Sequence, residues 1–294
     1  MQAIRVCGVV LAVCAIITGC NPQPKEGRVS VPSSTTDVRF EPLPDGAVVT
    51  DRASTGGVRL VDFDGDGDPD LFVTSGYDVS AEEPTAQPNR VYRNDDGTLV
   101  SRDSGPPVED AGFSSGSTWA DYDNDGDLDV FVSNQREQDN FLYRNNGDGV
   151  FTRVTEGPVV NDGGHSYSAA WVDVDDDGFV DLFVANGGMS HQGVDFLYRN
   201  LGDGSFSQVT EGDLVNTEGA SCGTAWGDYD DDGDQDVVVT NYRFGTSPAL
   251  YRNDGNFEFT RLEGVLDGPV LRGPGFIGFD LPSFRRDGSH RPQS

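Results

Sequence analysis

Residues 121–132 read Asp-Tyr-Asp-Asn-Asp-Gly-Asp-Leu-Asp-Val-Phe-Val, and the interpretation of the whole chain starts from this stretch. Aspartates occupy positions 1, 3, 5, 7 and 9, and the glycine at position 6 lets the backbone fold sharply. Carboxylates at this spacing place several oxygen atoms around one point, and oxygen is the ligand that calcium prefers. The stretch therefore predicts a calcium-binding loop.

Three more copies of this loop begin at Asp62, Asp173 and Asp228. Position 12 is valine in every copy, whereas an EF-hand has a bidentate glutamate there and continues as a helix. Short apolar runs such as Val130–Val132 follow instead, so each loop is expected to lead into a buried strand. The predicted metal residues are Asp62, Asp64, Asp66, Asp68, Asp70, Asp121, Asp123, Asp125, Asp127, Asp129, Asp173, Asp175, Asp177, Phe179, Asp181, Asp228, Asp230, Asp232, Asp234 and Asp236.

Solvated acidic turns are the alternative interpretation of these loops. The presence of aspartate at positions 1, 3, 5 and 9 in all four copies favours calcium, with about four ions bound. The loops hold 21 acidic residues in a chain of net charge −30, so bound calcium would relieve their repulsion and belong to the fold. The same charge excludes nucleic acid as a partner.

The N-terminus has the pattern of a secretory signal, with one basic residue, Arg5, before an apolar stretch over residues 6–17 that is too short to span a bilayer. The sequence Ile-Thr-Gly-Cys ending at Cys20 resembles the lipobox of bacterial lipoproteins, in which the cysteine is lipidated. We expect residues 1–19 to be a lipoprotein signal peptide and residues 20–37 a flexible tether. The protein is then extracytoplasmic and anchored by lipid in the bacterial cell envelope. A plain cleaved signal peptide is the alternative.

Cysteine use agrees with this location, because Cys222 is the only cysteine left once the signal peptide is removed and Cys20 is lipidated. No disulfide can then form within the chain. Cys222 begins an apolar segment and is expected to be a small buried thiol rather than a nucleophile, and its role stays open.

The loop starts are 59, 52 and 55 residues apart, a period that with β character indicates propeller blades. Each repeat also has Leu or Trp two residues before the loop, a Tyr-Arg-Asn triplet after it and a glycine-rich turn. Each repeat therefore predicts four strands: A before the loop, B after it, C with the triplet and D after the turn. In such a blade the calcium loops and glycine turns share one face, and the B to C and D to A loops share the other.

The triplets are interpreted as scaffold, with their arginines (Arg93, Arg144, Arg199 and Arg252) helping to balance nearby carboxylates. Residues 40–46 match a fifth strand D, and residues 275–280 resemble a fifth strand A. The expected fold is all-β, a β-propeller-like array of four full calcium-loop repeats with partial blades at both ends. The repeats cover residues 38–266, and residues 267–294 form a degenerate partial repeat and a loose tail.

These motifs resemble the FG-GAP/VCBS repeat family, the calcium-loop propellers of integrin α subunits and many bacterial surface proteins. The resemblance is strongest to the bacterial branch associated with ASPIC and UnbV domains, although no such domain follows here. It implies that calcium is mainly structural and that ligands meet the face opposite the metal loops. Family members commonly have seven blades, so a small propeller of four or five blades, closure with another chain and a truncated fragment of a larger propeller are all open.

The sequence favours a non-catalytic recognition, adhesion or protein-interaction module whose ligand is a protein or a polysaccharide. The B to C loops provide the candidate ligand face, with these contacts: Tyr77, His191, Tyr242, Arg243 and Phe244. The alternative is a calcium-dependent enzyme acting on polysaccharide or lipid. Against it, the mature histidines (His165, His191 and His290) have no spacing suited to zinc, and no nucleophile elbow or phosphate loop is present.

Overall fold

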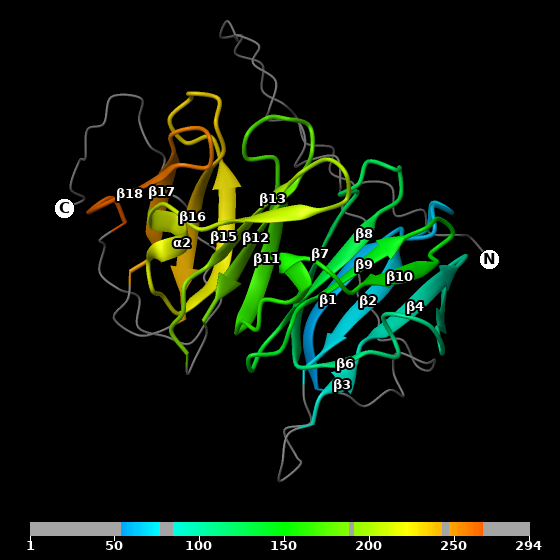
Figure 1. Ribbon diagram of the computed structural model, residues 1–294. Coiled ribbons are helices and arrows are strands. Elements are labelled where there is room, and N and C mark those ends of the chain that lie inside the picture. Colours follow the sequence, from blue (N-terminus) through cyan, green and yellow to red (C-terminus); the bar gives the residue numbers. More distant parts are fainter. Residues whose placement is uncertain (1–53, 77–84, 188–190, 243–246, 267–294) are drawn as a thin grey trace, which may run out of the picture. The chain divides into compact units, whose positions relative to one another are not determined.

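The computed structural model describes residues 54–76, 85–187, 191–242 and 247–266. These residues form four antiparallel sheets of four strands each, here called sheets 1 to 4 (Figure 1). Sheet 1 contains β1 (Thr55–Val61), β2 (Asp70–Ser75), β4 (Arg90–Asp95) and β5 (Thr98–Ser101). Sheet 2 contains β7 (Ser114–Ala120), β8 (Asp129–Asn134), β9 (Phe141–Asn145) and β10 (Phe151–Val154).

The other two sheets repeat this order. Sheet 3 contains β11 (Ser166–Val172), β12 (Asp181–Asn186), β13 (Phe196–Asn200) and β14 (Phe206–Val209). Sheet 4 contains β15 (Ser221–Gly227), β16 (Asp236–Asn241), β17 (Ala249–Asn253) and β18 (Phe259–Leu262). The predicted strands A to D are confirmed, since each sheet pairs its four strands in that order. The sheets form a β-propeller-like array of blades, and no sheet closes on itself.

Strand B is completely buried in sheets 1 to 3 and partly buried in sheet 4. All six residues of β2, β8 and β12 are buried, which agrees with their continuous apolar, β-branched sequence. The tyrosines of the Tyr-Arg-Asn triplets are also buried: Tyr92, Tyr143, Tyr198 and Tyr251 are 0–3% exposed. The interpretation of the triplets as scaffold is therefore confirmed.

Neighbouring sheets pack face to face through apolar side chains. One cluster joins Phe63 and Phe72 of sheet 1 to Val130 and Tyr143 of sheet 2. Equivalent clusters join sheet 2 to sheet 3 and sheet 3 to sheet 4. The hydrophobic core is thus divided into layers between consecutive sheets.

Several small elements were not predicted. β3 (Gln87–Pro88) pairs with β6 (Ala111–Gly112) as a short ribbon beside sheets 1 and 2. Two connections from strand D to strand A contain a single helical turn, η2 (Pro158–Val160) and α2 (Asp213–Asn216), whose apolar residues are buried. Across the described ranges, no helix has the length and apolar character needed to cross a bilayer. The predicted signal peptide, tether and partial blades (residues 40–46 and 275–280) lie outside those ranges, as do Cys20 and residues 267–294.

Candidate metal centres and the opposite loops

The four aspartate loops share one backbone path. Each begins directly after strand A, and its position 9 is the first residue of strand B. Two positions in each loop have positive φ. The glycine at position 6 was expected, with φ from 90° to 105°. Position 4 was not singled out from the sequence, but its φ lies between 58° and 73°, and its residues are Gly65, Asn124, Asp176 and Asp231. Gly, Asn and Asp tolerate this left-handed conformation best, so the residue types at position 4 could have indicated a positive φ there.

The carboxylate at position 1 holds the loop closed. Asp121 accepts hydrogen bonds from the backbone N–H of Asp125 at 3.0 Å and from that of Gly126 at 2.9 Å. The loops of Asp173 and Asp228 have the same pair of bonds. The loop is thus formed by its own backbone and first side chain.

Carboxylate oxygens converge at one point in every loop. The loops are numbered 1 to 4 in chain order, beginning at Asp62, Asp121, Asp173 and Asp228. In loops 2 to 4, oxygens of positions 1, 3 and 9 lie within 4.8 Å of one another, as for Asp121, Asp123 and Asp129. In loop 1, the converging residues are Asp62, Asp64 and Asp66. Position 5 of loops 2 to 4 is not in these groups, and its carboxylate accepts the N–H of position 7 instead, as Asp125 does from Asp127 at 3.1 Å.

The residues fit a hard divalent cation. All ligand atoms are oxygens, and at position 3 one oxygen of Asp123 and one of Asp175 are buried without a hydrogen-bond partner in the described structure. Burial, with the like charge of neighbouring aspartates, raises the pKa of both carboxyls. A buried anionic oxygen that lacks a partner is costly, and a bound cation would remove that cost. Calcium would be held by positions 1, 3 and 9 in loops 2 to 4 and by Asp62, Asp64 and Asp66 in loop 1, and it would supply the positive charge that these oxygens surround.

Position 9 is the most buried carboxylate of each loop. Asp70, Asp129, Asp181 and Asp236 are 0–1% exposed. Asp129 accepts the backbone N–H of Tyr122 at 3.1 Å and that of Asn145 at 2.7 Å, so it ties the loop to strand C. Burial raises the pKa of Asp129 and that of Asp181 to about 7. These carboxyls therefore serve the fold as well as the candidate metal centre.

The arginines of the triplets divide into two pairs. Arg199 lies 2.7 Å from Asp175, and Arg144 lies 3.9 Å from Asp123, so these two approach loop carboxylates as predicted. Arg93 and Arg252 instead form ion pairs with Asp95 and Asp254, two residues further along the chain. All four arginines therefore pair with nearby carboxylates, as predicted, although only two of those carboxylates belong to the aspartate loops.

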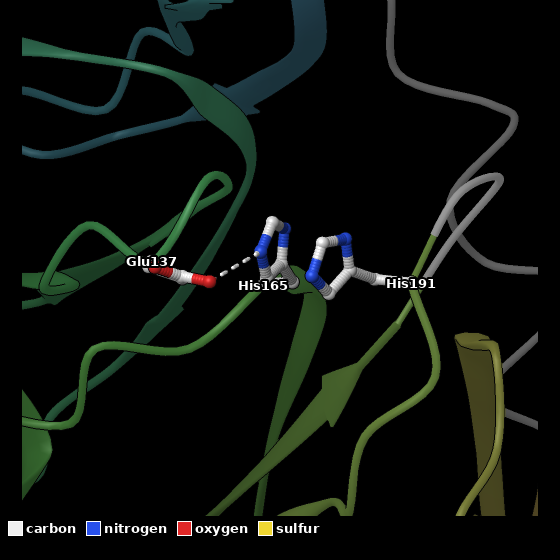
Figure 2. A group of neighbouring side chains, drawn as sticks. All are labelled: Glu137, His165 and His191. Atoms are coloured by element: carbon white, nitrogen blue, oxygen red, sulfur yellow. Dashed lines mark ion pairs between the residues drawn. The ribbon is translucent and has the colours of Figure 1, made fainter.

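The loops at the other end of the sheets bring three polar side chains together. Glu137 lies in the B to C loop of sheet 2, His165 just before β11 and His191 in the B to C loop of sheet 3 (Figure 2). The two imidazole rings stack with their centroids 3.4 Å apart, and Nε2 of His165 lies 3.8 Å from a carboxylate oxygen of Glu137. The sequence-based argument considered only the spacing of the histidines along the chain and did not anticipate this group, because chain spacing does not reveal residues that meet from three separate loops.

The tautomer of His165 argues against a metal at this cluster. Its Nδ1 accepts the backbone N–H of Arg136 at 3.2 Å, so in the neutral ring the proton is on Nε2, facing Glu137. Burial and the neighbouring His191 lower the pKa of His165, which favours the neutral ring. A metal-bound histidine has the reverse arrangement, because its free nitrogen donates a proton. The cluster is thus a partly exposed group of polar side chains at this end of the sheets.

The backbone beneath this cluster is strained. Arg136 and Glu137 both have positive φ, 65° and 58°, which is uncommon for such residues. The Arg136 guanidinium lies 4.9 Å above the Phe113 ring, and Phe113 N–H donates to Gln138 Oε1 at 2.9 Å. Strained backbone held by surrounding contacts is found disproportionately at functional sites.

Tyr242, another predicted contact residue, lies on the same face. It is 36% exposed, and its ring lies 6.1 Å from that of Tyr167 on β11. His191 and Tyr242 thus each contact a residue at the start of β11, His165 or Tyr167. His165 and Tyr167 were not predicted as contacts, because the candidate ligand face was taken from the B to C loops alone, although the D to A loops were expected on this face. Tyr77, Arg243 and Phe244 lie outside the described residues.

A comparison with known families identifies the repeat. The sequence profile described as FG-GAP-like repeat matches residues 62–132, 121–184 and 173–239, which together span residues 62–239. The chain belongs to the FG-GAP-like repeat family. Each match runs from the start of one aspartate loop to the strand B that follows the next, so the family pattern is the loop with its flanking strands.

Outside the family profile, the comparisons give little. No curated protein is found to match the sequence. Among solved structures, a lectin of Agrocybe aegerita, described as specifically recognising non-reducing terminal N-acetylglucosamine, has a TM-score of 0.39 and 17% sequence identity. The similarity covers 71% of this chain and 65% of the lectin chain. A similarity at this level does not bear on what the FG-GAP-like repeats described here bind.

The asparagine of each triplet has a role that sequence reasoning missed. Asn200 is fully buried, and its Nδ2 donates to the Val180 carbonyl at 3.1 Å and to the Tyr122 carbonyl of the preceding sheet at 2.7 Å. Asn145 and Asn253 bridge to the preceding sheet in the same way, to Phe63 and Val174. The recurrence of this asparagine in all four repeats was a signal in the sequence. Its partner could not be predicted, because the partner lies a whole repeat away.

We expect Asn200→Ala to reduce the free energy of unfolding by about 3 kcal/mol, because two buried carbonyls each lose their donor. Asn94→Ala is the matched control. Asn94 occupies the same position in sheet 1, but its Nδ2 donates only to the Pro69 carbonyl among the described residues. Its loss should cost about 1 kcal/mol. Urea unfolding of both variants in calcium measures the difference, and equal losses would contradict the inter-sheet role.

Proposed function

We propose that this chain is a calcium-stabilised, non-catalytic recognition module of the bacterial cell envelope, anchored by lipid at Cys20. Its ligand would be a protein or a polysaccharide, contacted by the loops opposite the aspartate loops. The FG-GAP-like repeats support a role as an interaction module. The lipobox-like sequence supports the anchor, and incorporation of a labelled fatty acid should require Cys20.

The main support for the proposal is that two kinds of loop lie at opposite ends of each sheet. The aspartate loops connect strands A and B at one end of each sheet, where they gather oxygen ligands. The B to C and D to A loops lie at the other end and carry Glu137, His165, His191 and Tyr242, and Tyr167 lies beside them at the start of β11. Loops held on a rigid scaffold are the usual place for binding residues.

The chemistry of the second end suits contact with a polar ligand. Side chains there include the stacked imidazoles, a pair of tyrosine rings and the Glu137 carboxylate, which is 75% exposed. Aromatic rings supply contact area with a polar edge, and a carboxylate accepts hydrogen bonds from hydroxyl or amide groups. These groups meet the needs of both a sugar and a peptide surface.

A panel of bacterial polysaccharides and envelope proteins, probed with and without calcium, tests the proposal. We expect at least one ligand to bind in calcium, without release of a product. Tyr242→Ala and Glu137→Ala should each weaken that binding about tenfold, which corresponds to about 1.4 kcal/mol. Asp148→Ala, in a glycine turn at the aspartate-loop end, is the matched control and should bind normally. Product release from any polysaccharide, or equal loss in the control, would contradict the proposal.

A further inference from the structure

Consecutive sheets are joined three times by one interface. Its first half is the side chain at loop position 2, which the next sheet covers: Phe63, Tyr122 and Val174 are only 3–4% exposed. Its second half is the tryptophan two residues before the next loop. The Trp171 ring lies 5.9 Å from that of Tyr122 and 6.4 Å from that of Phe131 on strand B of the preceding sheet. The interface therefore has two different, complementary halves.

A hydrogen bond across the same interface fixes its register. The triplet asparagine donates to the carbonyl of position 2 in the preceding sheet, at 2.7 Å from Asn145 to Phe63, 2.7 Å from Asn200 to Tyr122 and 3.1 Å from Asn253 to Val174. Apolar packing and this bond occur together at all three interfaces. Both features are thus expected wherever one sheet of this kind seats on another.

Among the described residues, sheet 1 and sheet 4 each have one half of this interface that no other sheet covers. In sheet 1, Leu60 stands at the tryptophan position and is 69% exposed, and Val58 beside it is 56% exposed. In sheet 4, Tyr229 at position 2 is 45% exposed, against 3–4% for its three equivalents. Val238, equivalent to the fully buried Phe72, Phe131 and Phe183, is only half-buried.

The hydrogen-bonding groups of the two open halves also match. Asn94 of sheet 1 has a donor to spare, because among the described residues its Nδ2 bonds only the Pro69 carbonyl. The Tyr229 carbonyl of sheet 4 is the acceptor that the pattern of the other interfaces assigns to such an asparagine. Within the described ranges, that carbonyl has no asparagine donor of this kind.

We propose that a second copy of this chain docks head to tail, with its sheet 1 seated on sheet 4 of the first copy. Leu60 of one copy packs on Tyr229 and Val238 of the other, and Asn94 donates to the Tyr229 carbonyl. The occupant is a second copy because the described part of one chain holds both halves of the interface, with the side chains of both halves exposed. The contact continues an interface that the fold already uses three times, and its two sides differ, so it is heterologous.

Charge gives this association a specific signature. The chain has a net charge of −30, so two copies repel each other at low ionic strength. The contact itself is formed by Leu, Val and Tyr side chains, which salt does not weaken by screening. Association should therefore strengthen between low and physiological salt, whereas contacts made by ion pairs would weaken.

Sedimentation of the full-length protein over a range of concentrations in calcium tests the docking. We expect concentration-dependent association that Leu60→Asp and Tyr229→Asp each weaken at least tenfold. Leu201→Asp is the control, because Leu201 is 52% exposed but lies in the turn between β13 and β14, outside the proposed contact. All three positions are exposed, so the variants should fold, which circular dichroism checks. A monomer at every concentration, or equal weakening by Leu201→Asp, would overturn the proposal.

Cross-linking separates docking between copies from closure within one chain. In a background with the native cysteines replaced by serine, one tagged copy carries Leu60→Cys and a differently tagged copy carries Tyr229→Cys. A short bis-maleimide should link the two tags, and adding Asn94→Ala to the first copy should reduce the yield. A link formed only inside a chain that carries both cysteines, with none between tags, would show closure within one chain and overturn the proposal.

Discussion

Removal of calcium with EDTA should lower the melting temperature of this protein by about 20 °C. A site with Kd on the order of 10⁻⁴ M in about 2 mM calcium stabilises the native state by about 1.8 kcal/mol. Four independent sites then contribute about 7 kcal/mol, and each kcal/mol shifts the melting temperature of a domain of this size by about 2–4 °C. Calorimetry in EDTA and in millimolar calcium measures the difference.

The physical reason lies in the converging carboxylates. Oxygens of three aspartates lie within 4.8 Å of one another in each loop, so without a cation their charges repel. At position 3 of loops 2 and 3, a buried oxygen also lacks a hydrogen-bond partner in the described structure. A bound cation turns both unfavourable contributions into favourable ones.

Variants at position 3 should lower the melting temperature in calcium but not in EDTA, a difference that a purely structural role would not produce. Asp123→Asn should leave the melting temperature in EDTA unchanged or higher, since it removes a repelling charge, but should lower it in calcium. Asp175→Asn should also lower the melting temperature in calcium, whereas in EDTA the loss of its ion pair with Arg199 offsets the relief of repulsion. Asp95→Ala, outside the loops, is the control and should leave the calcium-dependent shift intact. Coinciding melting curves with and without calcium would mean that the loops are only acidic turns.

Local pattern was enough to predict the strands and loops. The apolar run after each loop forms strand B, which is buried in sheets 1 to 3, and the repeat period predicted four such units in order. These features depend on residues close together in the sequence, such as the aspartates of one loop and the valines that follow it. The periodicity of the sequence was therefore enough to predict the fold class.

Contacts between repeats could not be predicted from the local sequence pattern. Asn200 bonds a carbonyl 78 residues away, and His165 meets Glu137 and His191 from separate loops. Their partners are fixed only when neighbouring sheets pack. Likewise, Arg93 and Arg252 were expected to balance nearby carboxylates, but the sequence did not show that an aspartate two residues along the chain, rather than a loop carboxylate, pairs with each guanidinium. Repetition marked these residues as structural without showing what they contact.

Asp195 shows how one such contact governs the response to pH. Its side chain is 3% exposed and accepts the backbone N–H of Asn186 at 2.8 Å and the hydroxyl of Ser221, in β15 of the next sheet, at 3.0 Å. Burial raises its pKa from 3.8 to about 7. At the equivalent place in sheet 2 the chain has Asn140, whose Nδ2 donates to Ser166 Oγ at 2.9 Å. An asparagine at position 195 can therefore keep both contacts without a charge.

Asp195→Asn should stabilise the protein at pH 8 by about 4 kcal/mol relative to the parent, because a rise of about three pKa units corresponds to that free energy. A raised pKa means that the folded state binds the proton more tightly. The parent's contribution from this group is therefore fully present below pH 3.8 and is lost as pH rises through about 7. The difference between variant and parent should thus be near zero at pH 4, grow between pH 4 and 7 and stay constant above. Urea unfolding in calcium at pH 4, 6 and 8 measures it, with Asp148→Asn, on an exposed turn, as the control that should show no trend. A difference that does not change between pH 4 and pH 8 would show that Asp195 is not held as a buried carboxylic acid between sheets 3 and 4.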